Sequence, residues 1–145
     1  MPAGRINQLD SEKFAFASGA WIDAARSILR DLVVDRGEPG RRFSVCERFT
    51  NAPQDVASSG TAAWHFRIDG KSVTVEPGEI ADADVTITAD YEATLPNARL
   101  VYTPEILAQR AVNRAQGKAP AIEGDMSKAP PYLVELHNRL AILTA

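Results

Sequence analysis

The chain has 145 residues, a formal net charge of −3 at pH 7 and one cysteine, Cys46. This length is typical of one domain, which we expect to span residues 1–145, and a lone cysteine excludes an intramolecular disulfide. The acidic balance lacks the broad positive field of nucleic-acid-binding proteins, so no nucleic-acid partner is expected. No apolar run reaches the roughly 20 residues that cross a bilayer, and charges in the N-terminal region argue against a signal peptide. We therefore expect a soluble, cytoplasmic protein.

A long helix is predicted at about residues 11–35. Asp10 or Ser11 is placed to accept hydrogen bonds from first-turn amide groups, and Gly37 and Pro39 follow the last helical residue. Apolar residues recur at steps of three and four, which is the spacing of one helix face. They are Phe14, Trp21, Ile22, Ala25, Ile28, Leu29 and Leu32.

The first strand of a sheet is predicted at residues 42–50. Phe43, Val45 and Phe49 alternate with polar residues, which is the period of a half-buried strand. Glu47 falls on the apolar side and interrupts it. Residues 51–60 are polar and contain several turn-forming residues, so we expect a loop there.

The stretch from Trp64 to Ala89 is predicted to form three consecutive antiparallel strands. Apolar and polar residues alternate in three short runs. Asp69-Gly70 separates the first two runs and is a strong hairpin signal, because a tight primed turn needs residues that tolerate positive φ. Pro77-Gly78 ends the second run. One face of this predicted meander is apolar and the other is polar.

Two helices are predicted after the meander. The first runs from Tyr91 to about Leu95, because Pro96-Asn97 interrupts any longer helix. The second begins at Thr103-Pro104, where threonine caps and proline takes the first helical position, and it ends near Gly117.

The chain is predicted to close with an edge strand and a helix. Residues 118–125 are expected to be extended, and Pro120 confines them to a sheet edge or to the first position of a strand. The last helix begins at about Pro130 or Pro131 and carries leucines at helical spacing. The sheet and the later helices therefore occupy residues 42–145.

Four short motifs resemble the sterol carrier protein 2 family of lipid-binding domains. They are Asp69-Gly70-Lys71, the ADADVTIT run at residues 81–88, Gly117-Lys118 and the IEGD run at residues 122–125. The resemblance extends from about Phe43 to the C-terminus. It implies an α/β fold of the α+β type, with a five-stranded, mostly antiparallel sheet that helices cover on one face and an apolar tunnel between sheet and helices.

The resemblance also implies a function. Members of this family bind sterols, fatty acids, fatty acyl-CoA or other hydrophobic molecules, and some are accessory domains of enzymes or act in isoprenoid quinone synthesis. This chain departs from the family pattern at Pro96-Asn97 and at Pro130-Pro131. The second departure leaves the angle of the last helix, and hence the tunnel mouth, open.

The tunnel is expected to be lined by apolar residues of the sheet and the later helices. A cavity of about 300–1,000 Å³ suits a drug-sized ligand, and burial of an apolar chain contributes roughly 25 cal/mol per Å². A plain, filled core is the alternative for each of these side chains. The predicted lining residues are Phe66, Val75, Val85, Ile87, Leu107, Val112, Leu133, Leu136 and Leu140.

Residues with catalytic or metal-binding chemistry are few. Cys46 in a strand is typical of a small buried hydrophobe. His65 and His137 are expected to face solvent, and no zinc spacing such as HExxH or CxxC is present. Arg41-Arg42 is the only adjacent basic pair, and it indicates either a solvated surface pair or a contact with a phospholipid or coenzyme A phosphate. We expect no metal and no cofactor.

The acidic residues near the end of the meander are open to two interpretations. Asp82, Asp84, Glu76 and Glu79 are either turn and edge residues kept in water, or they include an acid whose pKa an apolar cavity raises. The second interpretation would supply acid–base chemistry on a hydrophobic substrate.

Three functional hypotheses follow. The first is a non-enzymatic carrier, solubiliser or presenter of a hydrophobic small molecule, with a transient membrane or enzyme partner left open. The second is a cofactor-free acid–base enzyme on a steroid, terpenoid or acyl-CoA, with Asp84 or His65 as the acid–base residue. The third is an interaction module of a larger complex. The sequence leaves the ligand's identity and the oligomeric state open.

Overall fold

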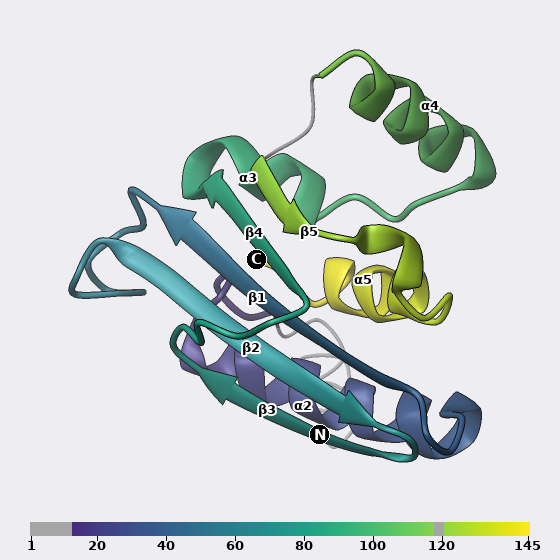
Figure 1. The fold of residues 1–145 in the computed structure, drawn as a ribbon. Helices are drawn as coiled ribbons and strands as arrows, with labels where there is room; N and C mark the ends of the chain where they lie inside the picture. Colours follow the sequence, from purple (N-terminus) through teal and green to yellow (C-terminus); the bar gives the residue numbers. More distant parts are fainter. Residues whose placement is uncertain (1–12, 118–120) are drawn as a thin grey trace, which may run out of the picture.

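The chain folds as a five-stranded mixed sheet with helices, an α+β architecture (Figure 1). This computed structural model describes residues 13–117 and 121–145. The strands are β1 (Arg42–Thr50), β2 (Thr61–Asp69), β3 (Ser72–Pro77), β4 (Val85–Asp90) and β5 (Ala121–Gly124). The helices are α2 (Gly19–Arg36), α3 (Tyr91–Ala98), α4 (Pro104–Ala115), the 3₁₀ turn η1 (Met126–Lys128) and α5 (Leu133–Ala141).

The order of strands across the sheet is β3-β2-β1-β4-β5. β1 pairs with β4 in parallel, and the other three pairings are antiparallel. The predicted five-stranded, mostly antiparallel sheet is therefore confirmed. The prediction of three consecutive antiparallel strands from Trp64 to Ala89 is wrong, because β4 leaves β3 and joins the far side of β1. β1, predicted as the first strand, lies at the centre of the sheet.

The parallel pair is fixed by a side-chain clasp between Asp84 and Ser44. Asp84 Oδ2 accepts hydrogen bonds from the Ser44 backbone N–H at 2.8 Å and from Ser44 Oγ at 3.1 Å. The Asp84 backbone N–H donates in return to Ser44 Oγ at 2.9 Å. The ADADVTIT run therefore includes a residue that docks the start of β4 onto β1, and alternation of apolar residues alone does not reveal this pairing.

Helix α2 begins later than the sequence predicts. Ser18 Oγ accepts a hydrogen bond from the Trp21 backbone N–H, and Ala17 has a positive φ of 60° just before it. Phe14, predicted inside the helix, instead forms an isolated parallel bridge with Thr144. Tertiary pairing with the C-terminal segment thus replaces the helix at residues 13–18, whereas the proposed caps at positions 10 and 11 lie outside the described residues.

Aromatic side chains join α2 to the apolar face of the sheet. Trp21 packs edge-on against both Phe16 and Trp64, with ring centroids 5.3 and 5.2 Å apart. The Trp21 indole N–H donates to Thr144 Oγ1 at 3.1 Å, and the Tyr91 hydroxyl donates to the Phe16 carbonyl oxygen at 2.7 Å. These bonds satisfy the polar atoms of buried rings, so the start of α2, β2 and the C-terminus share one core.

The later elements agree with the sequence more closely. α3 extends to Ala98 and includes Pro96, two turns rather than the single turn that was predicted, with Asp90 capping its first turn. α4 has the predicted threonine cap and proline start, and residues 121–124 form the expected edge strand. α5 begins shortly after the two prolines, at Leu133.

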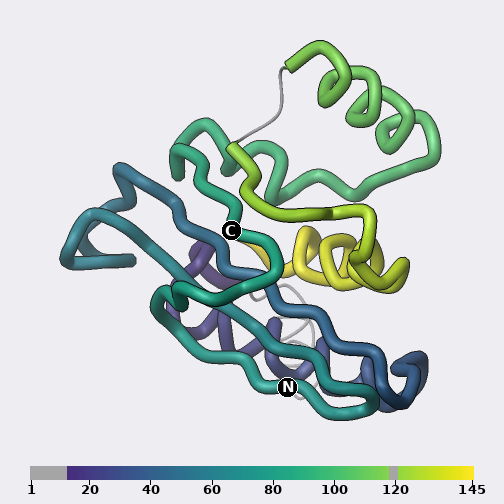
Figure 2. The backbone as a smooth tube through the Cα atoms, in the orientation of Figure 1, coloured from purple at the N-terminus to yellow at the C-terminus, as the bar shows by residue number. Residues whose placement is uncertain are grey.

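The helices cover the sheet unevenly. α2 packs on the β3 side of the apolar face, and α5 packs beside α2. α3 follows the end of β4, whereas α4 extends away from the body of the molecule (Figures 1 and 2). None of the α4 side chains is buried. Within the described residues, no helix is long and apolar enough to cross a membrane.

Gly124 in the IEGD run allows β5 to approach β4. Its φ is +107°, and a Cβ atom there would collide with the backbone carbonyl oxygen of Asp84. Gly60 also has a positive φ, +87°, but its Cβ would enter open space. Gly124 therefore carries a steric constraint that Gly60 does not.

We expect Gly124→Ala to destabilise the protein clearly more than Gly60→Ala. Backbone strain alone costs on the order of 1–3 kcal/mol, and Gly124→Ala adds a backbone collision that only movement of β5 relieves. Urea unfolding of the two variants measures the difference in free energy of unfolding. Equal losses in both variants would contradict the close approach of β5 to Asp84.

Candidate functional site

The nine predicted lining residues fall into two groups. Five are buried in the core, two are partly buried, and Leu107 and Val112 on α4 are 36% and 46% exposed. The buried five are Phe66, Val75, Val85, Leu136 and Leu140, and the partly buried two are Ile87 and Leu133. The structure therefore brings seven of them to the core or its edge and leaves the two on α4 uncovered.

A row of side chains crosses all five strands on the apolar face. The strand register aligns Pro77, Trp64, Glu47, Ile87 and Ile122 from β3 to β5. Trp64 is buried at 2% exposure, whereas Ile87 and Ile122 are only partly buried. The face is thus well covered on the β2 side and less covered on the β4–β5 side, and Glu47 lies at the boundary.

Glu47 is a partly buried carboxyl group on this apolar face. Its Oε1 accepts a hydrogen bond from the Trp64 indole N–H at 2.7 Å. Burial raises the pKa of the Glu47 carboxyl from 4.5 to about 7, although the Trp64 hydrogen bond opposes the rise. The group is therefore protonated in a large fraction of molecules near neutral pH, and in that state it can donate a hydrogen bond. Its interruption of the apolar pattern was the sequence signal, but sequence reasoning did not assign it to the site.

A polar cluster lies at the base of α4. The ring of Tyr102 stacks on His137 with centroids 3.8 Å apart, and the Arg110 guanidinium lies 4.7 Å from the Tyr102 ring centroid. Asn97 links Tyr102 to Arg110. Its side-chain NH₂ donates to the Tyr102 hydroxyl at 2.8 Å, and its side-chain oxygen accepts a hydrogen bond from the Arg110 guanidinium at 3.0 Å. The cluster therefore joins α3, α4 and α5, and it anchors α4 to the body.

Burial shifts the pKa values of two residues in this cluster. Burial lowers the pKa of His137, with Arg110 adding to the effect, and burial raises the pKa of Tyr102. The hydrogen bond from Asn97 and the charge of Arg110 oppose the rise in the Tyr102 pKa, and the charge of Glu47 adds to it. His137 was expected to face solvent, but it lies partly buried against Tyr102.

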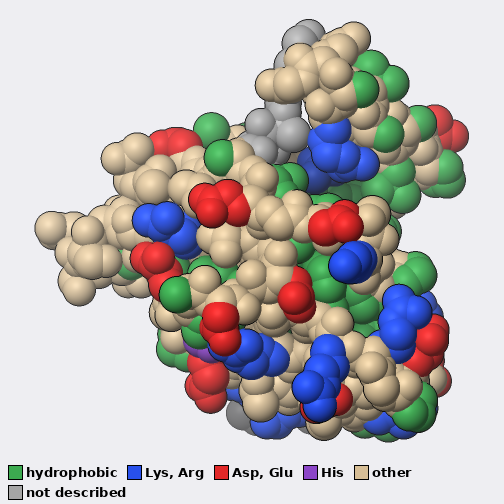
Figure 3. Space-filling model, viewed as in Figure 1, with side chains coloured by type: hydrophobic (Ala, Val, Ile, Leu, Met, Phe, Trp, Pro, Cys, Tyr) green, Lys and Arg blue, Asp and Glu red, His purple; other side chains and the backbone are tan. Residues whose placement is uncertain are grey.

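Exposed apolar side chains concentrate in the segment that contains α4. Of the eight large hydrophobic side chains that are well exposed within the described residues, five lie between positions 100 and 126. Hydrophobic side chains are visible along α4 and in the recess between α4 and the rest of this face (Figure 3). The five are Leu100, Val101, Leu107, Val112 and Met126.

The residues considered for catalysis lie elsewhere. The register places His65 opposite Cys46 and Glu76, on the face that Glu47 does not share, and its Nδ1 lies 2.9 Å from the Gly78 carbonyl oxygen. Asp84 is engaged by Ser44 in the clasp described above. Cys46 is fully buried, as predicted. The described residues contain no group of three or more potential metal ligands.

The other acidic residues near β3 and β4 hold surface ion pairs. Asp82 pairs with Arg67 at 2.6 Å, and Glu79 pairs with Arg48 at 3.0 Å. The Arg67 guanidinium holds the pKa of Asp82 below its usual value. These contacts favour the interpretation of the cluster as edge residues in water. Among the residues that the structure describes, Glu47 is the one carboxyl with a raised pKa.

Two cavities open on the described part of the molecule; Glu47 lines neither of them, although Pro77 at the β3 end of the row borders the larger one. One, of about 220 Å³, lies between the end of α2 and residues 128–132, and the other, of about 380 Å³, lies between the start of α2 and the loop before β2. None of the nine predicted lining residues borders either cavity.

Comparisons with known proteins give matches among solved structures. No family model matches the chain, and a search of curated proteins finds no match. The chain is similar to palmitated SCP2L2 from Aedes aegypti at 22% identity, over 83% of this chain and 94% of that one, with a TM-score of 0.48. It is also similar to sterol carrier protein domain 2 of Helicoverpa armigera, at 19% identity over 84% and 86% of the two chains, with a TM-score of 0.47. A ubiquinone synthesis protein, UbiJ-SCP2, matches at 15% identity over 81% and 88%, with a TM-score of 0.46.

We expect Glu47 to make stability fall as pH rises from about 4.5 to 7. In this window the unfolded chain releases the Glu47 proton while the folded chain keeps it, so the unfolded state is favoured progressively. At 1.36 kcal/mol per pKa unit the full cost is roughly 3 kcal/mol above pH 7. Glu47→Gln keeps an acceptor for Trp64 without the charge, so it should remove this fall when unfolding is measured by urea at pH 5 and pH 8.

The lowered pKa of His137 changes stability with pH in the opposite direction. Protonation of His137 costs stability at low pH, and this cost disappears as pH rises toward 6.5. Comparison of Glu47→Gln with the wild-type chain cancels that contribution, which both proteins share. Glu123→Gln, which changes an exposed carboxylate on β5, is the matched control. The assignment fails if the wild-type chain and Glu47→Gln lose the same stability between the two pH values.

Proposed function

We propose that the chain binds a hydrophobic small molecule between the β4–β5 side of the apolar face and the segment around α4, as a carrier, solubiliser or presenter. The observation that carries the proposal is the concentration of exposed apolar side chains between positions 100 and 126. Exposed apolar side chains that gather on one part of a folded chain indicate a ligand or partner site. The motif resemblance to sterol carrier protein 2 supports lipid as the class of ligand.

Covering this surface supplies the driving force for binding. Burial of an alkyl chain stabilises the complex by roughly 25 cal/mol per Å² of apolar area, so no catalytic group is needed for useful affinity. Leu107 and Val112 contribute apolar surface from α4, and Ile87 contributes from the sheet. All three belong to the predicted lining set.

Glu47 supplies the polar contact in this proposal. A protonated carboxyl beside Trp64 donates a hydrogen bond to a hydroxyl, carbonyl or carboxyl oxygen at one end of an otherwise apolar ligand. Sites for small molecules combine an apolar lining with a few placed polar groups of this kind. Sterols, fatty acids and isoprenoid lipids each carry such an oxygen.

A protein partner is the second candidate for the same surface, since exposed apolar residues on a helix also suit a helix-binding groove. The two candidates differ in what the purified protein carries. If the ligand is a hydrophobic small molecule, solvent extraction of the purified protein should release a lipid that mass spectrometry detects. A stably bound protein together with a lipid-free extract would favour the second.

We expect Leu107→Asp to lower the affinity for a fluorescent fatty acid by about tenfold or more, because the variant places a charge where the ligand's apolar chain packs. Fluorescence titration measures this affinity. Leu107 is already exposed, so the fold should tolerate the change. Val34→Asp is the matched control, because Val34 is 65% exposed on α2 and lies outside the proposed surface. The proposal would be wrong if both variants lowered the affinity equally, or if the wild-type protein bound no fatty acid.

A further inference from the structure

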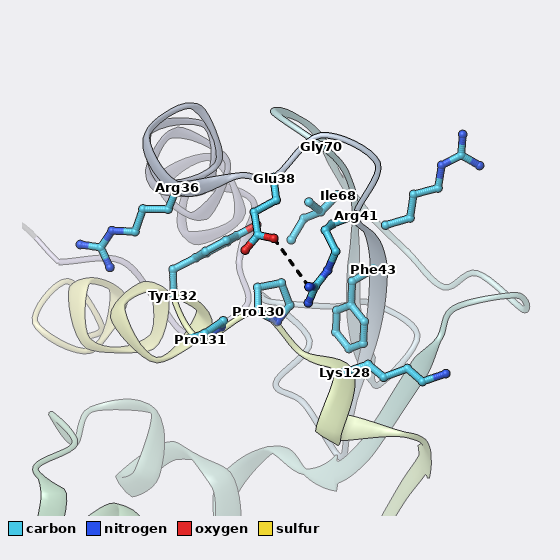
Figure 4. Close-up of a pocket in the computed structure, with 11 residues that line it drawn as sticks. Arg36, Glu38, Arg41, Phe43, Ile68, Gly70, Lys128, Pro130, Pro131 and Tyr132 are labelled. Carbon is cyan, nitrogen blue, oxygen red and sulfur yellow. Dashed lines mark ion pairs between the residues drawn. The ribbon is translucent and has the colours of Figure 1, made fainter.

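A second candidate site is a pocket of about 220 Å³ that borders none of the predicted lining residues. We name it the α2–α5 pocket. It is formed by the end of α2, residues 38–43, the β2–β3 hairpin and residues 128–132 (Figure 4). It therefore includes Pro130-Pro131, where the chain departs from the family pattern.

The floor of the α2–α5 pocket is apolar. Phe43, Ile68 and Tyr132 line it and are each less than 10% exposed. The Tyr132 ring extends from the start of α5 toward Glu38 and Arg41 in Figure 4. The hydrogen bonds among the described residues include none from the Tyr132 hydroxyl, and its oxygen is not among the buried unsatisfied atoms. Within the described residues, the Tyr132 hydroxyl therefore has no hydrogen-bond partner.

The rim of the pocket is cationic although the whole chain has a net charge of −3. Four basic side chains and one carboxylate, Glu38, line it. The basic residues come from three separate segments, and they are Arg36, Arg41, Arg42 and Lys128. Segments that are distant along the chain thus place basic residues around one pocket. In Figure 4 the Arg41 guanidinium lies over the pocket, whereas the charged ends of Arg36 and Lys128 extend outward on opposite sides.

The rim charges are available to an incoming anion. Arg41 pairs with Glu38 at 3.7 Å, and its side chain is 62% exposed. Arg36 and Arg42 also pair, with Glu135 and Asp69. Exposed pairs of this kind contribute little stability, so a phosphate or carboxylate competes with them readily. Lys128 makes no ion pair with any residue that the structure describes.

The backbone holds the rim loop in place before any ligand arrives. The Arg41 N–H donates to the Glu38 carbonyl oxygen at 3.0 Å, and the Gly70 N–H donates to the Arg41 carbonyl oxygen at 2.8 Å. The loop is therefore tied both to itself and to the β2–β3 hairpin. Such preorganisation reduces the entropy lost on binding.

We propose that the α2–α5 pocket binds an anionic amphiphile, with its phosphate or carboxylate group beside Arg41 and Lys128. The apolar part of the molecule lies on Phe43, Ile68 and Tyr132, and the Tyr132 hydroxyl donates to the anion. None of the residues that line this pocket belongs to the exposed apolar set around α4. Arg41-Arg42, a solvated pair by the simplest interpretation of the sequence, thereby gains a binding role from Lys128 and the apolar floor.

Calorimetric titration with octyl phosphate, octanoate, octan-1-ol and inorganic phosphate tests the proposal. Octyl phosphate or octanoate should bind at least about tenfold more tightly than octanol or inorganic phosphate, because each combines the anion with the apolar part. The tighter of the two identifies the preferred anion. Octanol that binds as tightly as both anionic amphiphiles would overturn the proposal.

Matched variants separate the pocket from other sites. Arg41→Gln and Lys128→Gln should each weaken octyl phosphate binding about five- to tenfold, whereas Arg30→Gln, which removes an exposed cation of α2 outside the pocket, should leave it unchanged. Binding that Leu107→Asp abolishes and Arg41→Gln preserves would overturn this inference while leaving the surface around α4 as a lipid site.

Discussion

The central position of β1 is the constraint on which the rest of the structure depends. β1 pairs with β2 along one edge and with β4 along the other, so both halves of the sheet meet on it. The clasp between Asp84 and Ser44 fixes the parallel half, and the close approach of Gly124 to Asp84 extends that half to β5. Residues in two of the motifs that resemble sterol carrier protein 2, Asp84 and Gly124, thus hold strands together. These motifs therefore indicate a fold more directly than they indicate a ligand.

Uneven cover of the apolar face gives the protein its candidate site. α2 and its aromatic contacts fill the β2–β3 side, where Trp21 meets Trp64. On the β4–β5 side the helices leave Ile87 partly buried and α4 without a buried side chain. Glu47 lies between the two sides, so its carboxyl is covered enough for its pKa to rise and remains beside the surface that a ligand would cover.

The sequence predicted the elements better than the site. Alternation located β1 and the β2–β3 hairpin, and Thr103-Pro104 located the start of α4, because these signals depend on neighbouring residues alone. The predicted lining residues were chosen because they are apolar, and they differ in exposure in the structure. Phe66 is buried in the core, whereas Leu107 is exposed on the surface. That division depends on how far α4 stands from the sheet. The α2–α5 pocket was equally hidden, since Lys128 and Arg41 are far apart along the chain.

The sequence by itself determined most of the local helices and strands and the interruption of the apolar pattern at Glu47, because periodicity, caps and turns are encoded within a few residues, and the resemblance of its short motifs indicated the class of fold. Only the tertiary structure decided that β4 joins β1 rather than β3, and that Phe14 pairs with Thr144 instead of extending α2. It also decided which side chains gather at each site. These outcomes rest on contacts between distant segments, whose energies depend on the packing of the whole chain.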